Sequence, residues 1–361
     1  MAVSLPSRLT GYGAYNLCFD KYLGRKTSNP ADLDFFAAIR SKGFNRINLV
    51  KVICFRNAQK ENLPLDRAVP IYIRRPAPPP YPQVIVNPAF LDNLSALVTS
   101  AAQHNFWVQV CIFHQQAIST PYAAAGVEQE LPKEVPPELA QDKNDTPCAR
   151  LKKFFNPRPA NVEQLARQKE LVNMIVTKLK DAPNVLFEIG NELRIEGGDC
   201  QRSDNCLLAE WLNIMGNEVI KVIGQTNKIG TSTGCYAVTP TPKCNEVDVF
   251  STCQKHFSPG FFDFHHGQWY DATDLAGAIT NAKKMRADKY KENIPTPLII
   301  NDDGADGTLR INNLETWAKT TFGLKLGLHY SSKQPYPNGG TIDDFDPAAL
   351  AALDRAAATP G

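Results

Sequence analysis

The stretch Pro183–Glu196, PNVLFEIGNELRIE, constrains the fold of this chain more than any other. Its opening Pro-Asn pair is typical of a turn, and the run 185–189 that follows is short, mostly apolar and rich in β-branched and aromatic residues. Such a run is typical of a buried strand in a parallel sheet. Asn191 and Glu192 come directly after it, at the strand end where parallel α/β folds hold their functional groups. The stretch therefore predicts a parallel α/β protein with a polar site at this strand end.

Strand-like and helix-like segments alternate along the rest of the chain, without internal repeats. Apolar runs predict eight strands, and most segments between them show the apolar spacing of amphipathic helices. These helices include 88–104, 161–181, 206–224 and 272–290, and the first has Phe90, Leu91, Leu94, Leu97 and Val98 on one face. This alternation predicts an α/β fold of the (β/α)8 TIM barrel type, with residues 1–361 as a single domain. The strands are expected at 10–19, 44–55, 106–113, 185–189, 228–234, 261–266, 297–301 and 324–330, with 247–251 as a rival for the sixth.

Two long segments interrupt the alternation. Residues 56–87 contain RRPAPPPYP, which is too stiff and too poor in hydrogen-bond donors for a helix or an inner strand. Residues 115–160 are also rich in proline and carry mixed charge. We expect long loops after strands two and three, on the C-terminal face of the barrel, where they would form the walls of a cleft.

Composition argues against several kinds of partner. The 361 residues include 39 basic and 37 acidic side chains, and this net charge of +2 argues against a nucleic-acid surface. No apolar run approaches the roughly 18 residues needed to span a bilayer. We therefore expect a monomer without nucleic-acid or membrane partners.

Nine cysteines are many for a cytosolic protein. Cys200 and Cys206 bracket a polar loop, and Cys54 and Cys111 lie in apolar runs typical of core thiols. Loop-closing disulfides fit the loop cysteines better than zinc, because no CxxC pair or suitably spaced histidine accompanies them. The sequence leaves their pairing open. Together with two glycosylation sequons, at Asn93 and Asn144, the cysteines favour an extracellular location, although the N-terminus shows no signal peptide.

The segment FEIGNE resembles the fourth strand of the retaining glycoside hydrolases with a (β/α)8 fold, a clan that includes cellulases, mannanases and glycoside hydrolase family 5. In that clan this strand ends in an asparagine and the acid/base glutamate. The resemblance implies that Glu192 is the acid/base, that Asn191 donates a hydrogen bond to a sugar 2-hydroxyl, and that the partner is a carbohydrate. A lone Asn-Glu pair would more often be a turn residue and a helix start, and the match of the whole stretch favours the site. Glu188 within this strand and Asp263 on strand six are expected to be buried, paired structural carboxylates.

The segment PLIINDDG, residues 297–304, resembles the seventh strand of the same clan, where a glutamate nucleophile ends the strand. Here that position is Asp302, whose side chain is one methylene shorter. Three outcomes stay open: Asp302 is the nucleophile at the roughly 5–5.5 Å spacing of a retaining enzyme, it activates a water at roughly 6.5–9.5 Å, or hydrolysis is lost. Asp303 would serve if the strand end were shifted by one residue.

A second departure lies on strand two. The clan often has an arginine in the pattern GFNxxR, where it fixes the position and charge of the nucleophile. In GFNRIN that place is taken by Asn48. Together with Asp302, this change predicts a remodelled nucleophile half beside an unchanged acid/base half.

Further residues at predicted strand ends match sugar-binding positions of the clan. His114 ends strand three, and the pair His265 and His266 ends strand six, where strand alternation allows only one of the two to point into the barrel mouth. Trp269 follows strand six, and Tyr330 ends strand eight, so either aromatic ring could stack on a pyranose face. The resemblance implies no cofactor.

Two other functions compete with hydrolysis by paired carboxylates. A metal-dependent barrel hydrolase would explain the histidines at strand ends, with Asp302 and His329, but strand one lacks the His-x-His with which such sites usually begin. A carbohydrate-binding barrel without catalysis would explain Asp302 and Asn48.

Overall fold

The computed structural model describes residues 10–13, 17–23, 35–41, 46–49, 69, 71–75, 83–114, 118, 145–158, 162–191, 193, 195, 200, 204–225, 228–231, 234–235, 261–266, 298–302, 308–323, 327–330 and 347–358. Of the strand residues in 10–13, 46–49, 261–266, 298–302 and 327–330, and of His114, only the backbone is considered below.

Eight parallel strands form a closed ring. Around the ring the order is β1, β2, β5, β6, β7, β9, β10 and β11, and the pairing of β11 with β1 closes it. A closed parallel ring of eight strands with helices outside it is the (β/α)8 barrel that the alternation predicted. The strands are β1 (Thr10–Gly13), β2 (Arg46–Leu49), β5 (Trp107–His114), β6 (Val185–Asn191), β7 (Ile229–Thr231), β9 (Phe261–His266), β10 (Leu298–Asp302) and β11 (Gly327–Tyr330).

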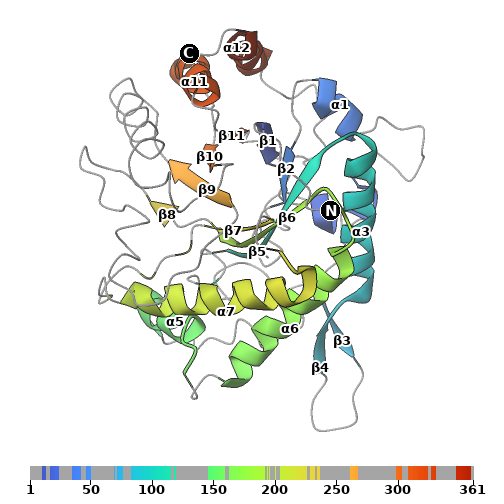
Figure 1. Ribbon diagram of the computed structural model, residues 1–361, viewed down its shortest axis with the longest axis vertical. Coiled ribbons are helices and arrows are strands. Elements are labelled where there is room, and N and C mark those ends of the chain that lie inside the picture. Colours follow the sequence, from blue (N-terminus) through green and yellow to red (C-terminus); the bar gives the residue numbers. More distant parts are fainter. Residues whose placement is uncertain are drawn as a thin grey trace.

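Helices surround the ring, as Figure 1 shows. Within the described part of the chain, α3 contacts β5 and α6, α6 contacts α7, and α11 contacts α12 and β11. None of the described helices is both long and apolar enough to cross a membrane. The helices are α1 (Phe35–Ser41), α3 (Pro88–Gln103), α5 (Pro147–Phe154), α6 (Val162–Leu179), α7 (Asn205–Ile223), α11 (Thr308–Gly323) and α12 (Pro347–Ala358), with a short 3-10 helix η1 (Leu17–Phe19).

Local sequence explains where these helices begin and end. Asn87 caps α3, its Oδ1 accepting a hydrogen bond from the Ala89 backbone at 3.1 Å, and a proline follows at the first helical position. Thr146 caps α5 in the same way. Helix α7 ends at Gly224, which adopts φ +67°, a left-handed conformation that glycine reaches without steric cost.

Apolar helix faces form the layer between helices and strands. The predicted face of α3, including Phe90, Leu94 and Leu97, is fully buried, and so are Leu171 and Ile175 of α6. Every residue of β6 is buried, as expected for an inner strand of a parallel barrel. The periodicity of the sequence therefore identified the core of this half of the barrel.

The N-terminal end of the barrel is held by polar side chains. Asn184, predicted as a turn residue, donates from Nδ2 to the carbonyls of Val98 at 3.1 Å and Phe106 at 2.9 Å, and so joins α3 to the start of β5. Lys228 is 4% exposed and its Nζ donates to the Ala182 carbonyl at 3.1 Å. Burial away from water lowers the pKa of Lys228.

Three predictions of secondary structure were wrong in part. The first strand ends at Gly13, and Leu17–Phe19, which were predicted as part of it, form η1. The proline-rich segment before α3 holds a separate antiparallel pair, β3 (Tyr72–Arg75) and β4 (Gln83–Val86), in place of a continuous loop. The segment after β5 holds α5. The rival strand at 247–251 and the predicted helix at 272–290 lie outside the described residues.

The fifth strand of the barrel, β7, is extended by a short piece, β8 (Gly234–Cys235). Thr231 lies beside Phe262 and Gly234 beside His265, an equal step of three residues on both strands. Strands β7 and β8 therefore follow β9 in one register, and the fifth strand reaches beyond β7 to the C-terminal end of β9.

The side chain of Asn93, in the first sequon, is hydrogen-bonded within the protein. Asn93 Nδ2 donates to the carbonyls of Cys18 at 2.9 Å and Asp20 at 3.2 Å, which joins α3 to η1. An amide nitrogen used in this way is a poor acceptor for a glycan, so Asn93 does not support the predicted extracellular location.

Candidate active site at the strand ends

The C-terminal end of β6 carries Asn191 in a buried position. Its side chain is 2% exposed, and its Oδ1 accepts no hydrogen bond within the structure. Buried amide oxygens in proteins almost always have a donor, and each exception calls for an explanation. An acceptor left for a ligand hydroxyl is one such explanation. It differs from the predicted role, in which the amide donates to the hydroxyl, and Asn184 Oδ1, at the other end of β6, is likewise buried without a donor.

Close packing explains why position 190 in FEIGNE is a glycine. A Cβ atom on Gly190 would lie 2.1 Å from Leu193 Cδ1, so no other residue fits without displacing that leucine. Leu193 is fully buried, and Ile195 is 2% exposed. The chain beyond β6 is therefore packed back onto the strand immediately after Asn191. Glu192, the predicted acid/base, lies outside the described residues.

The other predicted positions lie on neighbouring strand ends. His114 is the last residue of β5 and lies beside Asn191 in the strand register. Asp302 is the last residue of β10 and lies beside Tyr330, the last residue of β11. Since all eight strands run in the same direction, these backbone positions share the C-terminal end of the barrel.

Strand β9 brings the predicted histidine pair to the same end. His265 lies beside Asn301 of β10, and His266 ends the strand. Asn48 lies one residue before the end of β2, beside Gly13 of β1. Trp269 lies outside the described residues.

The two strands proposed to carry carboxylates are not neighbours. Between β6 and β10 the ring contains β7 and β9 on one side and β11, β1, β2 and β5 on the other. The C-terminal ends of β6 and β10 therefore lie across the barrel mouth from one another and not on adjacent strands.

The predicted structural role of Glu188 is confirmed. Glu188 is fully buried, and its Oε2 accepts a hydrogen bond from Gln109 Nε2 at 2.8 Å. This contact links β5 to β6 within the strands that carry His114 and Asn191. Asp263, expected to play a similar part, is described only in its backbone position on β9.

Sequence reasoning missed a helix close to this end of the barrel, and it predicted loop disulfides without their pairing. Helix α5 lies after β5, and its Cys148 is bonded to Cys200, which follows β6. Cys206 is disulfide-bonded as well. The signal for α5 was present in Thr146-Pro147, a capping residue followed by proline at the first helical position. The proline content of the surrounding segment concealed it.

Cys148, Cys200 and Asp204 form the only group of metal-ligating residues in the described part of the chain. Because the two sulfurs are bonded to each other, they do not offer the thiolates that a metal would need.

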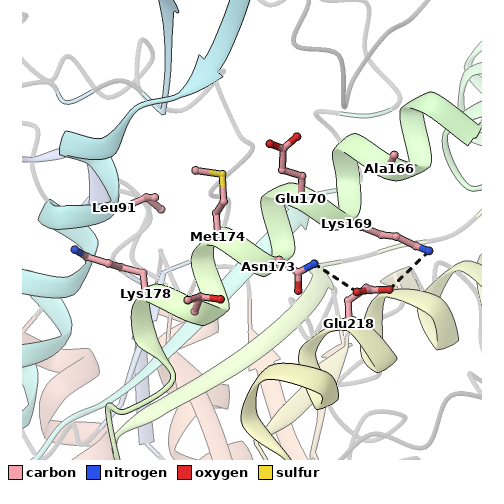
Figure 2. Close-up of a pocket in the computed structure, with 9 residues that line it drawn as sticks. Leu91, Ala166, Lys169, Glu170, Asn173, Met174, Lys178 and Glu218 are labelled. Carbon is pink, nitrogen blue, oxygen red and sulfur yellow. Dashed lines mark hydrogen bonds and ion pairs between the residues drawn. The ribbon is translucent and has the colours of Figure 1, made fainter.

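A surface hollow of about 810 Å³ lies elsewhere, on the helix layer between α3, α6 and α7 (Figure 2). Figure 2 shows α6 crossing this hollow, with Glu218 of α7 on one side and Leu91 of α3 on the other. The hollow contains none of the residues that the motifs single out, so it is separate from the candidate site.

Comparison with solved structures shows what this fold is similar to. An endo-1,4-β-mannanase from Rhizomucor miehei superposes with a TM-score of 0.58 at 12% identity, over 99% of this chain and 96% of the other. Endo-glycoceramidase II from Rhodococcus sp., in complex with a cellobiose-like imidazole, gives 0.60 at 15% identity, over 96% and 78%. A GH5 family lichenase from Caldicellulosiruptor sp. gives 0.54 at 11% identity, over 96% and 92%.

Comparison of the sequence with protein-family models and with curated proteins gives no match. At these low identities the structural likeness concerns the fold alone. It establishes a (β/α)8 barrel similar to those of glycoside hydrolases of family 5.

Proposed function

We propose that this protein is a glycoside hydrolase that cleaves O-glycosidic bonds in an oligo- or polysaccharide. One observation carries the proposal: the FEIGNE and PLIIND motifs end two strands, β6 and β10, at the same end of one closed parallel barrel. The likeness to family 5 barrels supports it, because that fold is used for this chemistry in the proteins named above.

In the proposed mechanism Glu192 and Asp302 act on opposite sides of one glycosidic bond. Glu192 donates its proton to the leaving oxygen as the bond to the anomeric carbon breaks. Asp302 either attacks the anomeric carbon or removes a proton from the water that attacks it. The amide of Asn191, whose Oδ1 is buried without a donor, would bind a hydroxyl of the sugar.

The printed names of the similar structures guide the choice of substrate. They include a 1,4-β-mannanase, a lichenase and an enzyme bound to a cellobiose-like inhibitor. We therefore propose a β-linked glycan as substrate, and a screen of mannan, lichenan and soluble cellulose for release of reducing sugar is the first test. Equal turnover with and without EDTA is expected, and loss of turnover with EDTA would favour a metal-dependent hydrolase.

Glu192→Gln tests the acid/base assignment. The variant keeps the size of the side chain but cannot deliver a proton, so kcat should fall about 10²–10⁴-fold. Glu163→Gln, an exposed position on α6, is the matched control and should retain full activity. A fully active Glu192→Gln protein would end the glycosidase assignment.

The anomer of the first product, followed by NMR, tests the role of Asp302. A retained configuration makes Asp302 the nucleophile, whereas an inverted one makes it the base for an attacking water. In either case Asp302→Asn should lower kcat at least about 10²-fold, and Asp302→Glu, which keeps the charge, should lower it less.

A carbohydrate-binding barrel without catalysis is the second candidate. The replacement of glutamate by Asp302 and of arginine by Asn48 at the nucleophile half favours it. Binding of cello- or mannooligosaccharides by calorimetry, without release of reducing sugar from any glycan, would decide for this candidate.

A further inference from the structure

Two segments that leave the barrel on adjacent strands are joined covalently. Helix α5 follows β5, and residues 193–204 follow β6. The disulfide Cys148–Cys200 connects them, with a Cα–Cα distance of 5.6 Å and a sequence separation of 52 residues. Cys148 is 1% exposed, at the start of α5. The bond therefore fixes a point eight residues beyond Glu192.

An ion pair reinforces this joint. Lys152 Nζ of α5 lies 2.8 Å from Asp204 Oδ2. A carboxylate oxygen of Asp204 and the two sulfurs of the disulfide lie within 4.8 Å of one another. Asp204 occupies the N-cap position of α7 but makes no side-chain capping bond there. Its carboxylate is used to hold α5, so the disulfide and the ion pair form one compact joint.

Helix α5 is itself held against the barrel. The ring of Phe154, on α5, lies 5.7 Å from that of Phe113 on β5 and 5.7 Å from that of Trp211 on α7. Gln168 of α6 is fully buried, donates to the Phe154 carbonyl at 3.2 Å and accepts from Trp211 Nε1 at 2.7 Å. Close aromatic packing and satisfied buried hydrogen bonds hold α5 in a fixed position against the barrel.

The described residues on both sides of Glu192 are thus held in place. Before it, Asn191 ends a fully buried strand. After it, Leu193 packs over Gly190, Ile195 is buried, and Cys200 is bonded to the seated helix α5. An acid that must meet a leaving oxygen within hydrogen-bond reach gains from such anchoring, because a displacement of about 1 Å can cost about 10²-fold in rate.

We propose that Cys148, Cys200 and Lys152 are positioning residues that hold the segment of Glu192 for proton delivery to the leaving group; this inference depends on the proposed function. They touch neither substrate nor the reacting atoms. They act through the backbone between β6 and α7. Their loss should weaken general-acid catalysis selectively, since Asp302 ends β10, a strand whose neighbours in the ring are β9 and β11 and not β5 or β6.

The test uses substrates that differ in their need for an acid. A β-glycoside with a dinitrophenyl leaving group departs without protonation, whereas an unactivated disaccharide linkage needs the proton. For the double variant Cys148→Ser with Cys200→Ser, kcat on the unactivated linkage should fall about tenfold, with KM changed less than about twofold. On the dinitrophenyl glycoside, kcat/KM, which reports the bond-breaking step alone, should change less than about twofold.

A second set of variants leaves the disulfide intact. Lys152→Met removes the pair with Asp204 and should lower kcat on the unactivated linkage about threefold, while Lys152→Arg should restore it. Lys153→Met is the matched control: Lys153 lies next along α5, but its partner Asp145, at 2.7 Å, belongs to the same segment. If the cysteine variant does not fold, this set decides alone.

The outcomes separate clearly. Selective loss on the unactivated linkage supports the inference. Equal loss on both substrates, or no loss on either while the melting temperature falls, overturns it and leaves the joint as a stabiliser only. A wild-type protein that cleaves neither substrate, nor any glycan in the screen, contradicts the proposed function itself.

Discussion

Two asparagines at opposite ends of β6 show how the same side chain serves different purposes. Asn184, before the strand, donates two hydrogen bonds to carbonyls of other segments. Asn191, at the other end, is almost fully buried, and the Oδ1 atoms of both residues have no donor within the structure. In (β/α)8 barrels the N-terminal end is associated with stability and the C-terminal end with function. The contacts of Asn184 agree with the first half of this division, and the role proposed for Asn191 agrees with the second.

Matched substitutions test that contrast. Asn184→Ala leaves the carbonyls of Val98 and Phe106 without donors and should lower the free energy of unfolding by about 2 kcal/mol. Asn191→Ala removes an amide whose oxygen has no donor and should cost less than about 1 kcal/mol, while kcat falls about 10²-fold. Urea denaturation and initial rates measure both. The reverse pattern would contradict the assigned roles.

The residue scale also shows where prediction from sequence succeeds. The buried, paired state of Glu188 was predicted because a carboxylate inside an apolar strand needs a partner. Its partner Gln109 was not predicted, since a contact between residues 79 positions apart leaves no local pattern. The same limit applies to the joint of Cys148 with Cys200.

At the scale of elements, α6 and α7 are joined by a network around Glu218, drawn in Figure 2. Glu218 is 7% exposed and lies 2.8 Å from Lys221, 3.4 Å from Asn173 and 3.7 Å from Lys169. Burial disfavours the charged carboxylate, but the hydrogen bonds from Lys221 and Asn173 and the two lysine charges outweigh it. The pKa of Glu218 is therefore lowered.

The lowered pKa of Glu218 makes the contact between α6 and α7 sensitive to acid. The folded state prefers ionised Glu218, so its stabilisation is present above the ordinary pKa of 4.5 and is lost as pH falls through the lower folded value. Glu218→Gln should cost about 1 kcal/mol of unfolding free energy at pH 7, and the cost should shrink below pH 4.5. Glu170→Gln, on the exposed face of α6, should differ from wild type by less than about 0.5 kcal/mol at either pH.

The packing of α5 against α6 and α7 gives a second prediction at this scale. Gln168→Ala leaves Trp211 Nε1 and the Phe154 carbonyl without their partner, and two buried groups without partners should cost about 2–4 kcal/mol. Thermal unfolding followed by circular dichroism measures the loss. Glu163→Ala, exposed on the same helix, is the control and should stay within about 0.5 kcal/mol of wild type.

Periodicity predicted long elements better than short ones. Helices α3, α6 and α7 and strand β9 lie within a residue or two of the predicted ranges, because each has a continuous apolar face or run. Helix α5 and the β3–β4 pair were missed, because prolines around them gave the stronger local signal. Short elements depend on tertiary contacts, such as the Phe154 and Trp211 rings, that sequence spacing does not reveal.

At the scale of the whole molecule, closure of the ring predicts where unfolding is most costly. The amide of Val108 donates to the Asn184 carbonyl and that of Phe187 to the Lys228 carbonyl, both at 2.8 Å. These protons should exchange only when the barrel opens as a whole. In hydrogen-exchange mass spectrometry β5 and β6 should therefore exchange at least about 10³-fold more slowly than the end of α12. Comparable rates would show that this helix and the barrel open together.

The barrel itself was predicted from the alternation of strands and helices, whereas its site was predicted only by position. The strand ends of β5, β6, β9, β10 and β11 do meet at one end of the ring, because parallel closure requires it. The spacing between Glu192 and Asp302 depends on how each strand end tilts into the mouth. No pattern of residue types encodes such a tilt.

The β3–β4 pair has a consequence for solubility. Each strand of the closed ring has a neighbour on both sides, whereas among the described residues β3 and β4 pair only with one another, so their outer edges are candidates for an added strand. Arg74 and Arg75 end β3, and the prolines of the intervening RRPAPPPYP segment cannot donate to an added strand. Replacing these arginines with valines should turn the pair into a nucleus for self-association at high protein concentration.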